Sequence, residues 1–170
     1  DIQKIGQNIK FDILVLRKYG VKVAGPLFDT MIAHYLLNPE LHHGMDYLAE
    51  TYLNYKPVPI EQLIGPKGKK QGSMRNVPIE EIKEYAAEDA DITLQLKSYF
   101  EPLMKQEDVE SLFYDMEMPL IYVLAEMEAT GVKVDTQALK QSSVTLSNQL
   151  ANLEKEIHGL AGCEFNINST

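Results

Sequence analysis

The chain of 170 residues has one cysteine, no tryptophan and no long hydrophobic run. Its single cysteine, Cys163, cannot form a disulfide within the chain, which is typical of proteins in a reducing cytoplasm. No apolar stretch approaches the roughly 18 residues that a membrane-spanning helix needs, and no signal-peptide pattern opens the sequence. From these absences we expect a cytoplasmic location and no association with a membrane.

The chain also has no excess of basic residues: its formal net charge is −9 at pH 7. This charge argues against an autonomous DNA-binding module, because such modules are usually basic. The acidity is concentrated at one end: residues 1–105 carry 13 basic and 14 acidic residues, whereas residues 106–170 carry 3 and 11. The change in composition predicts a domain boundary between residues 105 and 106.

The pattern of apolar residues predicts a mixed α/β chain with an α-rich C-terminal part. We expect a short strand before Asn8 and a helix over residues 9–19 with Asn8 as its N-cap. A long helix is expected to begin at Ile79, with Pro102 kinking or restarting it. The other expected elements are a strand at 21–23, an extended piece at 132–134, short helical turns at 59–64, and helices at 31–37, 46–53 (capped by Asp46), 109–129 (with Pro119 inside) and 136–161.

The helix that begins at Ile79 carries one carboxylate on an otherwise apolar face. A period of 3.6 residues places Asp89 on the same face as Tyr85 and Ile92, and places the solvated residues Glu84, Glu88, Asp91 and Gln95 opposite. A buried carboxylate is unfavourable unless it is hydrogen-bonded, paired or bound to a metal. Asp89 is therefore either a metal ligand or a capped residue of the core or of a groove.

Asp12 is the second carboxylate in an apolar setting, on a face of the 9–19 helix away from Lys10. Acidic residues are common in the first turn of a helix because they interact favourably with its N-terminus, so Asp12 needs no ligand role. Asp12 and Asp89 together nevertheless favour a shared metal site, since hard divalent cations prefer oxygen ligands.

Two segments resemble motifs of the DEDD nucleases in their tyrosine-bearing branch. Residues 8–12, Asn-Ile-Lys-Phe-Asp, resemble the second exonuclease motif, and residues 85–89, Tyr-Ala-Ala-Glu-Asp, resemble the third. Segments that resemble the bacterial DNA polymerase I family (family A) in order and spacing lie at 6–8, 28–31, 85–93, 117–120, 131–135 and 164–166. The resemblance implies an RNase H-like exonuclease fold without its first strands in residues 1–105. It implies an all-helical thumb base, at the start of the polymerase domain, in residues 106–170.

The resemblance also implies roles in a 3'-5' proofreading exonuclease. Asp89 would bind the first metal ion and Asp12 the second, the ions being Mg²⁺ or Mn²⁺. Tyr85 would orient the attacking water, and Asn8 would contact the single-stranded 3' end of DNA or shape the site. The whole protein would be a DNA-directed DNA polymerase that acts in DNA replication and repair.

The first motif of the family, an Asp-x-Glu on the opening strand, has no counterpart before Asn8. A later Asp-x-Glu, at residues 115–117, follows the third motif in the helical part. Both ends of the sequence resemble cuts in a longer chain. We therefore expect half of a metal site, no metal bound to this chain, and neither exonuclease nor polymerase activity from the chain by itself.

A loop at residues 65–76 carries four basic residues, with no acidic residue between Glu61 and Glu80. It is either a segment that follows a phosphate backbone of DNA or an ordinary solvated loop. Its basic residues are Lys67, Lys69, Lys70 and Arg75. The pair His42 and His43 lacks metal-ligand spacing to other His or Cys residues and is interpreted as structural or exposed.

Two other functions fit parts of the sequence. A 3'-5' exoribonuclease has the same two motifs, but residues 117–135 resemble the polymerase and would serve no purpose in it. A non-catalytic interaction module would use the acidic helical tail. For the favoured interpretation, a fragment of the polymerase, the leucine-rich face of the helix at 136–161 and an open sheet edge predict self-association.

Overall fold

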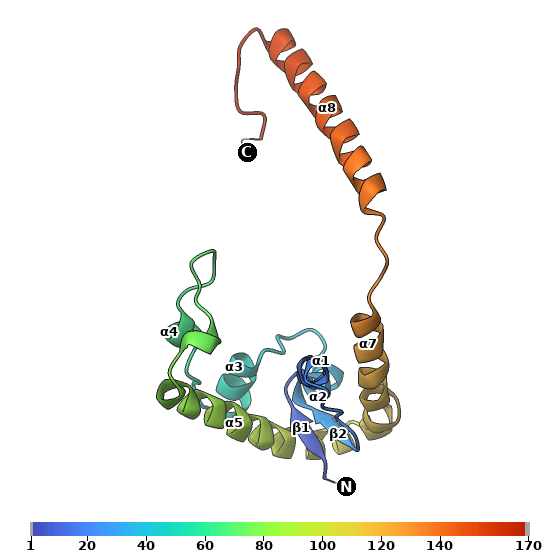
Figure 1. Ribbon diagram of the computed structural model, residues 1–170. Coiled ribbons are helices and arrows are strands. Elements are labelled where there is room, and N and C mark those ends of the chain that lie inside the picture. The colour runs from blue at the N-terminus through green and yellow to red at the C-terminus, as the bar shows by residue number, and fades with distance from the viewer. Residues whose placement is uncertain (1, 169–170) are drawn as a thin grey trace. The chain divides into compact units, whose positions relative to one another are not determined.

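The structure is a computed structural model that describes residues 2–168 (Figure 1). It contains many helices and one small parallel sheet, as expected for a mixed α/β chain. The chain divides into two compact units, Asp1–Thr130 and Gly131–Thr170. No helix within residues 2–168 has the length and apolar character needed to cross a membrane.

Strand β1 (Lys4–Gly6) pairs in parallel with β2 (Leu27–Asp29), with Ile5 opposite Phe28. The helix α1 (Ile9–Lys18) connects them, so the chain begins with a β-α-β unit (Figure 1). The strand before Asn8 is confirmed, but the strand expected at residues 21–23 is wrong. Residues 21–24 form neither helix nor strand, because the backbone N–H of Lys4 donates to Pro26 and pairing starts only there.

The N-terminus of α1 is capped by a residue from β2 and not by Asn8. Asn8 has a left-handed backbone (φ 58°) and makes no side-chain cap. The carboxylate of Asp29 accepts the backbone N–H groups of Asn8 (3.2 Å) and Ile9 (2.8 Å) instead. It also accepts those of Met31 (2.9 Å) and Ile32 (3.3 Å), so one buried carboxylate caps α1 and α2 (Thr30–Leu37) together.

A series of short elements follows α2: α3 (Met45–Leu48), the π-helix η1 (Ala49–Leu53), α4 (Glu61–Ile64) and the 3-10 turn η2 (Met74–Asn76). Asp46 is not the expected N-cap, since it is the second residue of α3 and the cap position is Gly44. The buried ring of His34 in α2 links this region: its Nδ1 lies 2.7 Å from Nδ1 of His43 and its Nε2 lies 2.8 Å from the Tyr52 hydroxyl. Burial, followed by the neighbouring His43, lowers the pKa of His34 to about 4, so this ring is neutral near pH 7.

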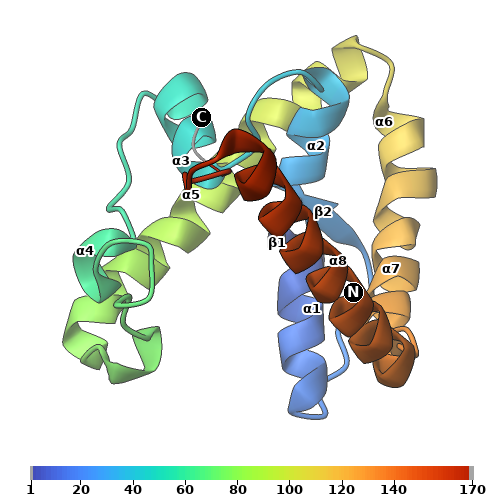
Figure 2. The same cartoon turned by 90° about the horizontal axis from the view of Figure 1, so that it is seen from above.

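Helix α5 (Ile79–Gln106) packs against α2 and β1 and is the longest element of the first unit (Figure 2). The expected restart at Pro102 does not occur, because the helix continues for four residues beyond it. Phe100 and Met104, on either side of the proline, are fully buried and hold both turns in the core.

The helix expected at 109–129 is divided into α6 (Glu110–Leu112), the π-helix η3 (Phe113–Glu117) and α7 (Met118–Thr130). The wide turn of η3 ends two residues before Pro119, which lacks the N–H that would continue an α-helical ladder. Helix α7 packs against α1, and the ion pairs Lys10–Glu128 and Arg17–Glu126 join the two helices.

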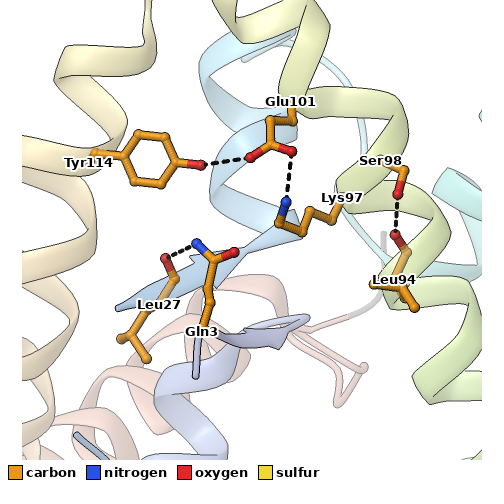
Figure 3. Close-up of polar contacts among 7 residues, drawn as sticks. All are labelled: Gln3, Leu27, Leu94, Lys97, Ser98, Glu101 and Tyr114. Atoms are coloured by element: carbon orange, nitrogen blue, oxygen red, sulfur yellow. Dashed lines mark hydrogen bonds and ion pairs between the residues drawn. The ribbon is translucent and has the colours of Figure 1, made fainter. Parts of the chain in front are cut away.

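The boundary expected between residues 105 and 106 is not the boundary between the two compact units. Residues 106–130 belong to the first unit, because the chain after α5 folds back and packs against it. The ring of Phe113 lies 4.9 Å from that of Phe28, centre to centre. The hydroxyl of Tyr114 donates to Glu101 (3.1 Å), which also accepts a hydrogen bond from Lys97 (Figure 3). Residues 106–130 therefore pack with the sheet, and a functional boundary at 105 stays a prediction.

The second unit consists mainly of α8 (Thr136–Ala161), whose bounds are those predicted. Asp135 caps it by accepting the N–H groups of Gln137 and Ala138, and Gly162 ends it with φ 69°. Residues 132–134 belong to no strand, and no residue of α8 is buried.

We expect Asp29→Asn to lower the free energy of unfolding of the first unit by about 1–3 kcal/mol, because an amide has one acceptor oxygen and leaves helix N–H groups unpaired. Chemical denaturation followed by circular dichroism measures the change. Asp135→Asn is the matched control, since it alters the same kind of cap at an exposed site of the second unit. Equal stability of the Asp29→Asn variant and the unaltered chain would contradict the central role of this cap.

Candidate active site

A cavity of about 660 Å³ brings together Asp12 from α1 and Asp89 from α5. Residues at the end of β1 also line this cavity, because β1 ends close to α1. Gly6 allows this close approach: a Cβ at position 6 would lie only 2.9 Å from Cβ of Ile9. The remaining lining residues are Ile5, Gly6, Gln7, Met45, Ala86, Ala90, Thr93 and Leu94. Two motifs that are far apart in the sequence thus share one concave site.

Asp89 is half-buried, and its Oδ1 atom is buried without a hydrogen-bond partner. Burial raises the pKa of its carboxyl to about 6; Tyr85 opposes this rise, whereas Glu88 and Asp46 add to it. The backbone carbonyl of Asp89 accepts a hydrogen bond from the Thr93 hydroxyl (2.7 Å), one turn later in α5. The Asp89 side chain therefore has an unpaired oxygen on the face of α5 that the sequence pattern identified as otherwise apolar.

Asp12 is exposed, which corrects the prediction that it lies on a buried face. The buried side of α1 consists of Ile9 and Ile13, and even Phe11 next to Asp12 is 62% exposed. Partial burial still raises the pKa of the Asp12 carboxyl, opposed by a backbone hydrogen bond. Of the two carboxylates that line the cavity, Asp12 is thus exposed and Asp89 is half-buried.

Tyr85 lies one turn before Asp89 on α5 and is half-buried, but it is not among the residues that line the cavity. Burial raises the pKa of its phenol to about 12, and the nearby charges of Asp89 and Asp46 act in the same direction. The phenol therefore keeps its proton at neutral pH and is available as a hydrogen-bond donor.

Asn8 is exposed at the start of α1, where its backbone N–H donates to Asp29 (3.2 Å) and its carbonyl accepts from the N–H of Phe11 (2.9 Å). Its neighbour Gln7, for which the sequence analysis gave no role, lines the cavity. The Gln7 side chain donates to the carbonyl of His43 (2.7 Å) and accepts from the Thr30 hydroxyl (2.5 Å), so its orientation is fixed. The sequence feature that could have identified Gln7 as a site residue is its place next to Asn8 in the segment 6–8, which resembles the family.

The basic residues of the loop at 65–76 are all exposed and line no part of this cavity. Lys67 lies 4.0 Å from the carboxylate of Glu61, an interaction too exposed to fix the loop. The structure therefore brings Asp12, Asp89 and nearby Tyr85 together, and leaves Lys67, Lys69, Lys70 and Arg75 on a separate surface.

The donor set of the cavity fits part of a site for a divalent cation. Carboxylate oxygens are the ligands that hard cations prefer, and an unpartnered buried oxygen such as Oδ1 of Asp89 is suited to that role. Within residues 2–168 no group of three or more His, Cys, Asp or Glu residues is arranged to hold a metal ion. Two carboxylates are fewer than a two-metal phosphodiester site uses.

Residues 1–105 match a family model described as a 3'-5' exonuclease. The chain is 40% identical to DNA polymerase I of Rhizobium leguminosarum (99% of this chain, 16% of that protein). It is 41% identical to DNA polymerase I of Chloroflexus aurantiacus (98% and 18%) and 38% identical to that of Borreliella burgdorferi (97% and 18%). The chain thus spans less than a fifth of each of these relatives.

A solved structure shares the fold. The POL domain of Pol1 from M. smegmatis, in complex with DNA primer-template and dNTP, aligns with a TM-score of 0.77 and 23% sequence identity. The alignment covers 98% of this chain and 26% of that chain.

In the 170-residue chain we expect the Asp89 carboxyl to titrate near pH 6, because burial disfavours its charged form. Tyr85→Phe should raise this midpoint further, since the phenol stabilises the carboxylate. Carboxyl ¹³C chemical shifts measured against pH test both statements, and the signal missing from Asp89→Asn assigns the resonance. A midpoint near 4, or a fall in the midpoint of Tyr85→Phe, would contradict this description of the site.

Proposed function

Since the chain belongs to the 3'-5' exonuclease family of the family A DNA polymerases, as the resemblance in its sequence indicated, we propose that it forms part of the proofreading exonuclease of a DNA polymerase I. The observation that carries this proposal is the cavity in which the second-motif Asp12 and the third-motif Asp89 meet. The substrate would be the single-stranded 3' end of DNA. The whole enzyme would act in replication and repair in the cytoplasm.

We assign residues 1–105 to an RNase H-like exonuclease domain and residues 106–170 to the helical base of the thumb. The parallel β1-α1-β2 unit, with α5 packed against β1, supports the first assignment. The end of the family match at residue 105 and the entirely helical structure of the elements after it support the second.

Asp89 would help to hold the first and Asp12 the second of two divalent cations, Mg²⁺ or Mn²⁺, whose positive charge would favour ionisation of water and stabilise the leaving 3'-oxygen. Asp89 is ionised above about pH 6 and can therefore act as a ligand at neutral pH. Tyr85, with a pKa of about 12, keeps its proton and would donate a hydrogen bond that orients the attacking water.

Asn8 and the basic loop would bind the nucleic acid. Asn8 lies exposed beside the cavity-lining Gln7, where it would contact the terminal nucleotide. The exposed cations of the loop, Lys67, Lys69, Lys70 and Arg75, would follow the phosphate backbone away from the cavity. The comparisons favour DNA over RNA as substrate, because the relatives matched along the whole chain are DNA polymerases.

In the complete polymerase that contains this region, we expect Asp89→Ala and Asp12→Ala to lower the rate of nucleotide release by roughly 100-fold or more, since each removes a metal ligand. Tyr85→Phe should lower it by about 10-fold, because one hydrogen bond to water is lost. Release of the 3'-terminal nucleotide from labelled single-stranded DNA measures these rates, and polymerisation should be unchanged.

Asp91→Asn is the matched control, because Asp91 is an exposed carboxylate of α5 that accepts a hydrogen bond from Gln95 of the same helix. The 170-residue chain by itself should release no nucleotide in this assay, since two carboxylates do not hold two cations. Metal-dependent release by the chain alone would contradict the proposed incompleteness of the site. Unchanged release by Asp89→Ala would contradict the assignment of the site itself.

We also expect the 170-residue chain to self-associate through α8 and the open edges of its two-stranded sheet. The apolar face of α8 is exposed, with Leu146 at 58%, Leu150 at 67% and Leu153 at 53%. Leu150→Lys should shift the equilibrium towards monomer in sedimentation velocity, whereas Gln141→Lys, on the opposite face of the helix, should not. A 19.2 kDa monomer at high concentration of the unaltered chain would contradict this expectation.

A further inference from the structure

Glu88, which directly precedes Asp89, binds a distant segment with both oxygens of its carboxylate. Oε1 accepts a hydrogen bond from the hydroxyl of Tyr55 at 2.5 Å, and Oε2 accepts one from the backbone N–H of Val58 at 3.0 Å. The helical periodicity placed Glu88 on a solvated face, but the structure shows it half-buried under the connection between η1 and α4. We name residues 54–58 the crossing segment.

The part of α5 that carries the candidate site has little other support. No residue between Ile79 and Asp91 is buried, and the buried residues of α5 begin at Ile92. Among the described residues 79–91, Glu88 is the one whose side chain forms hydrogen bonds to a segment outside α5. The other side-chain bonds there, Lys83 to Glu80 and Gln95 to Asp91, join residues of α5 to each other.

The crossing segment is itself well anchored. It follows directly on η1, which packs against α5, and it begins at Asn54 with a left-handed backbone (φ 51°). The N–H of Tyr55 donates to the carbonyl of Ala49 (3.2 Å), and Pro57 is buried. A carboxylate that binds two points of such a segment restrains the helix turn to which it belongs.

We propose that Glu88 is a positioning residue that holds the turn from Tyr85 to Asp89 against the crossing segment, so that Oδ1 of Asp89 stays directed into the cavity. The role rests on the proposed exonuclease function. Glu88 lines no part of the cavity and acts through its neighbours.

The kinetic test uses the complete polymerase. Glu88→Ala removes both bonds and should lower kcat of nucleotide release by about 10-fold, with KM for DNA within about 2-fold, because misplaced catalytic groups slow the reaction without removing DNA contacts. Tyr55→Phe removes one bond and should lower kcat by about 3-fold. Glu88→Gln keeps one acceptor oxygen and should restore part of the rate lost in Glu88→Ala. Glu84→Gln, an exposed carboxylate one turn earlier, is the matched control and should match the unaltered enzyme.

A spectroscopic test of the 170-residue chain requires no activity. The hydrogen bond to Glu88 raises the pKa of Tyr55 above its ordinary value of 10.0. Ring ¹³C shifts of labelled tyrosine should therefore show Tyr55 titrating at lower pH in Glu88→Gln than in the unaltered chain, and no such change in Glu84→Gln. Unchanged circular dichroism and unfolding midpoints of the variant 170-residue chains exclude misfolding as the cause of a lower kcat.

A lower kcat in the Glu88 and Tyr55 variants, together with the shift of Tyr55, would support the role of Glu88. A shift of Tyr55 without any change in kcat would overturn that role and leave the proposed function intact. Identical titration of Tyr55 with and without the Glu88 carboxylate would overturn the contact itself. Absence of nucleotide release by the unaltered polymerase would overturn the proposed function, and the positioning role with it.

Discussion

The carboxylate of Asp29 is the interaction on which the first unit depends. It ends β2, accepts four backbone N–H groups, and thereby fixes where α1 and α2 begin. Burial raises the pKa of this carboxyl and the four hydrogen bonds oppose the rise, so its charge is offset by helix N–H groups. Because β1 pairs with β2 directly beside it, the two strands and the two helices are all oriented around one side chain.

The candidate site follows from this arrangement. With the start of α1 fixed, Gln7 faces the cavity between its bonds to Thr30 and His43, and Asp12 follows on the first turns of the helix. The other carboxylate comes from α5, which the sheet and α2 hold through its buried C-terminal half. The site therefore needs contacts between segments far apart in the sequence, although each of its motifs is short.

Features with local causes could be predicted from the sequence, and features with distant causes could not. Helix α8 was predicted with its observed bounds because Asp135 and Gly162 mark its ends chemically. The cap of α1 was misassigned to Asn8, since its real partner, Asp29, lies 20 residues away from Ile9. Periodicity placed Glu88 opposite Asp89, but it cannot show which segment later covers that face. A shared site of Asp12 and Asp89 was suggested by two carboxylates in apolar settings, and the family resemblance then assigned a role to each.

The unpaired oxygen of Asp89 lies in a helix that is stable for other reasons. A buried acceptor without a hydrogen-bond partner lowers the stability of the fold by about 1–3 kcal/mol. Burial of the apolar side chains of Leu96, Phe100 and Met104 in the same helix offsets this loss. The buried side chains of α5 thus begin at Ile92, and the candidate site residues Tyr85 and Asp89 precede them. The end that carries Tyr85 and Asp89 has no buried residue of its own, so its position depends on polar contacts such as those of Glu88 with Tyr55 and Val58. If a few hydrogen bonds hold this part of α5 while the core supplies the stability, substitutions in the candidate site should change its chemistry without unfolding the domain.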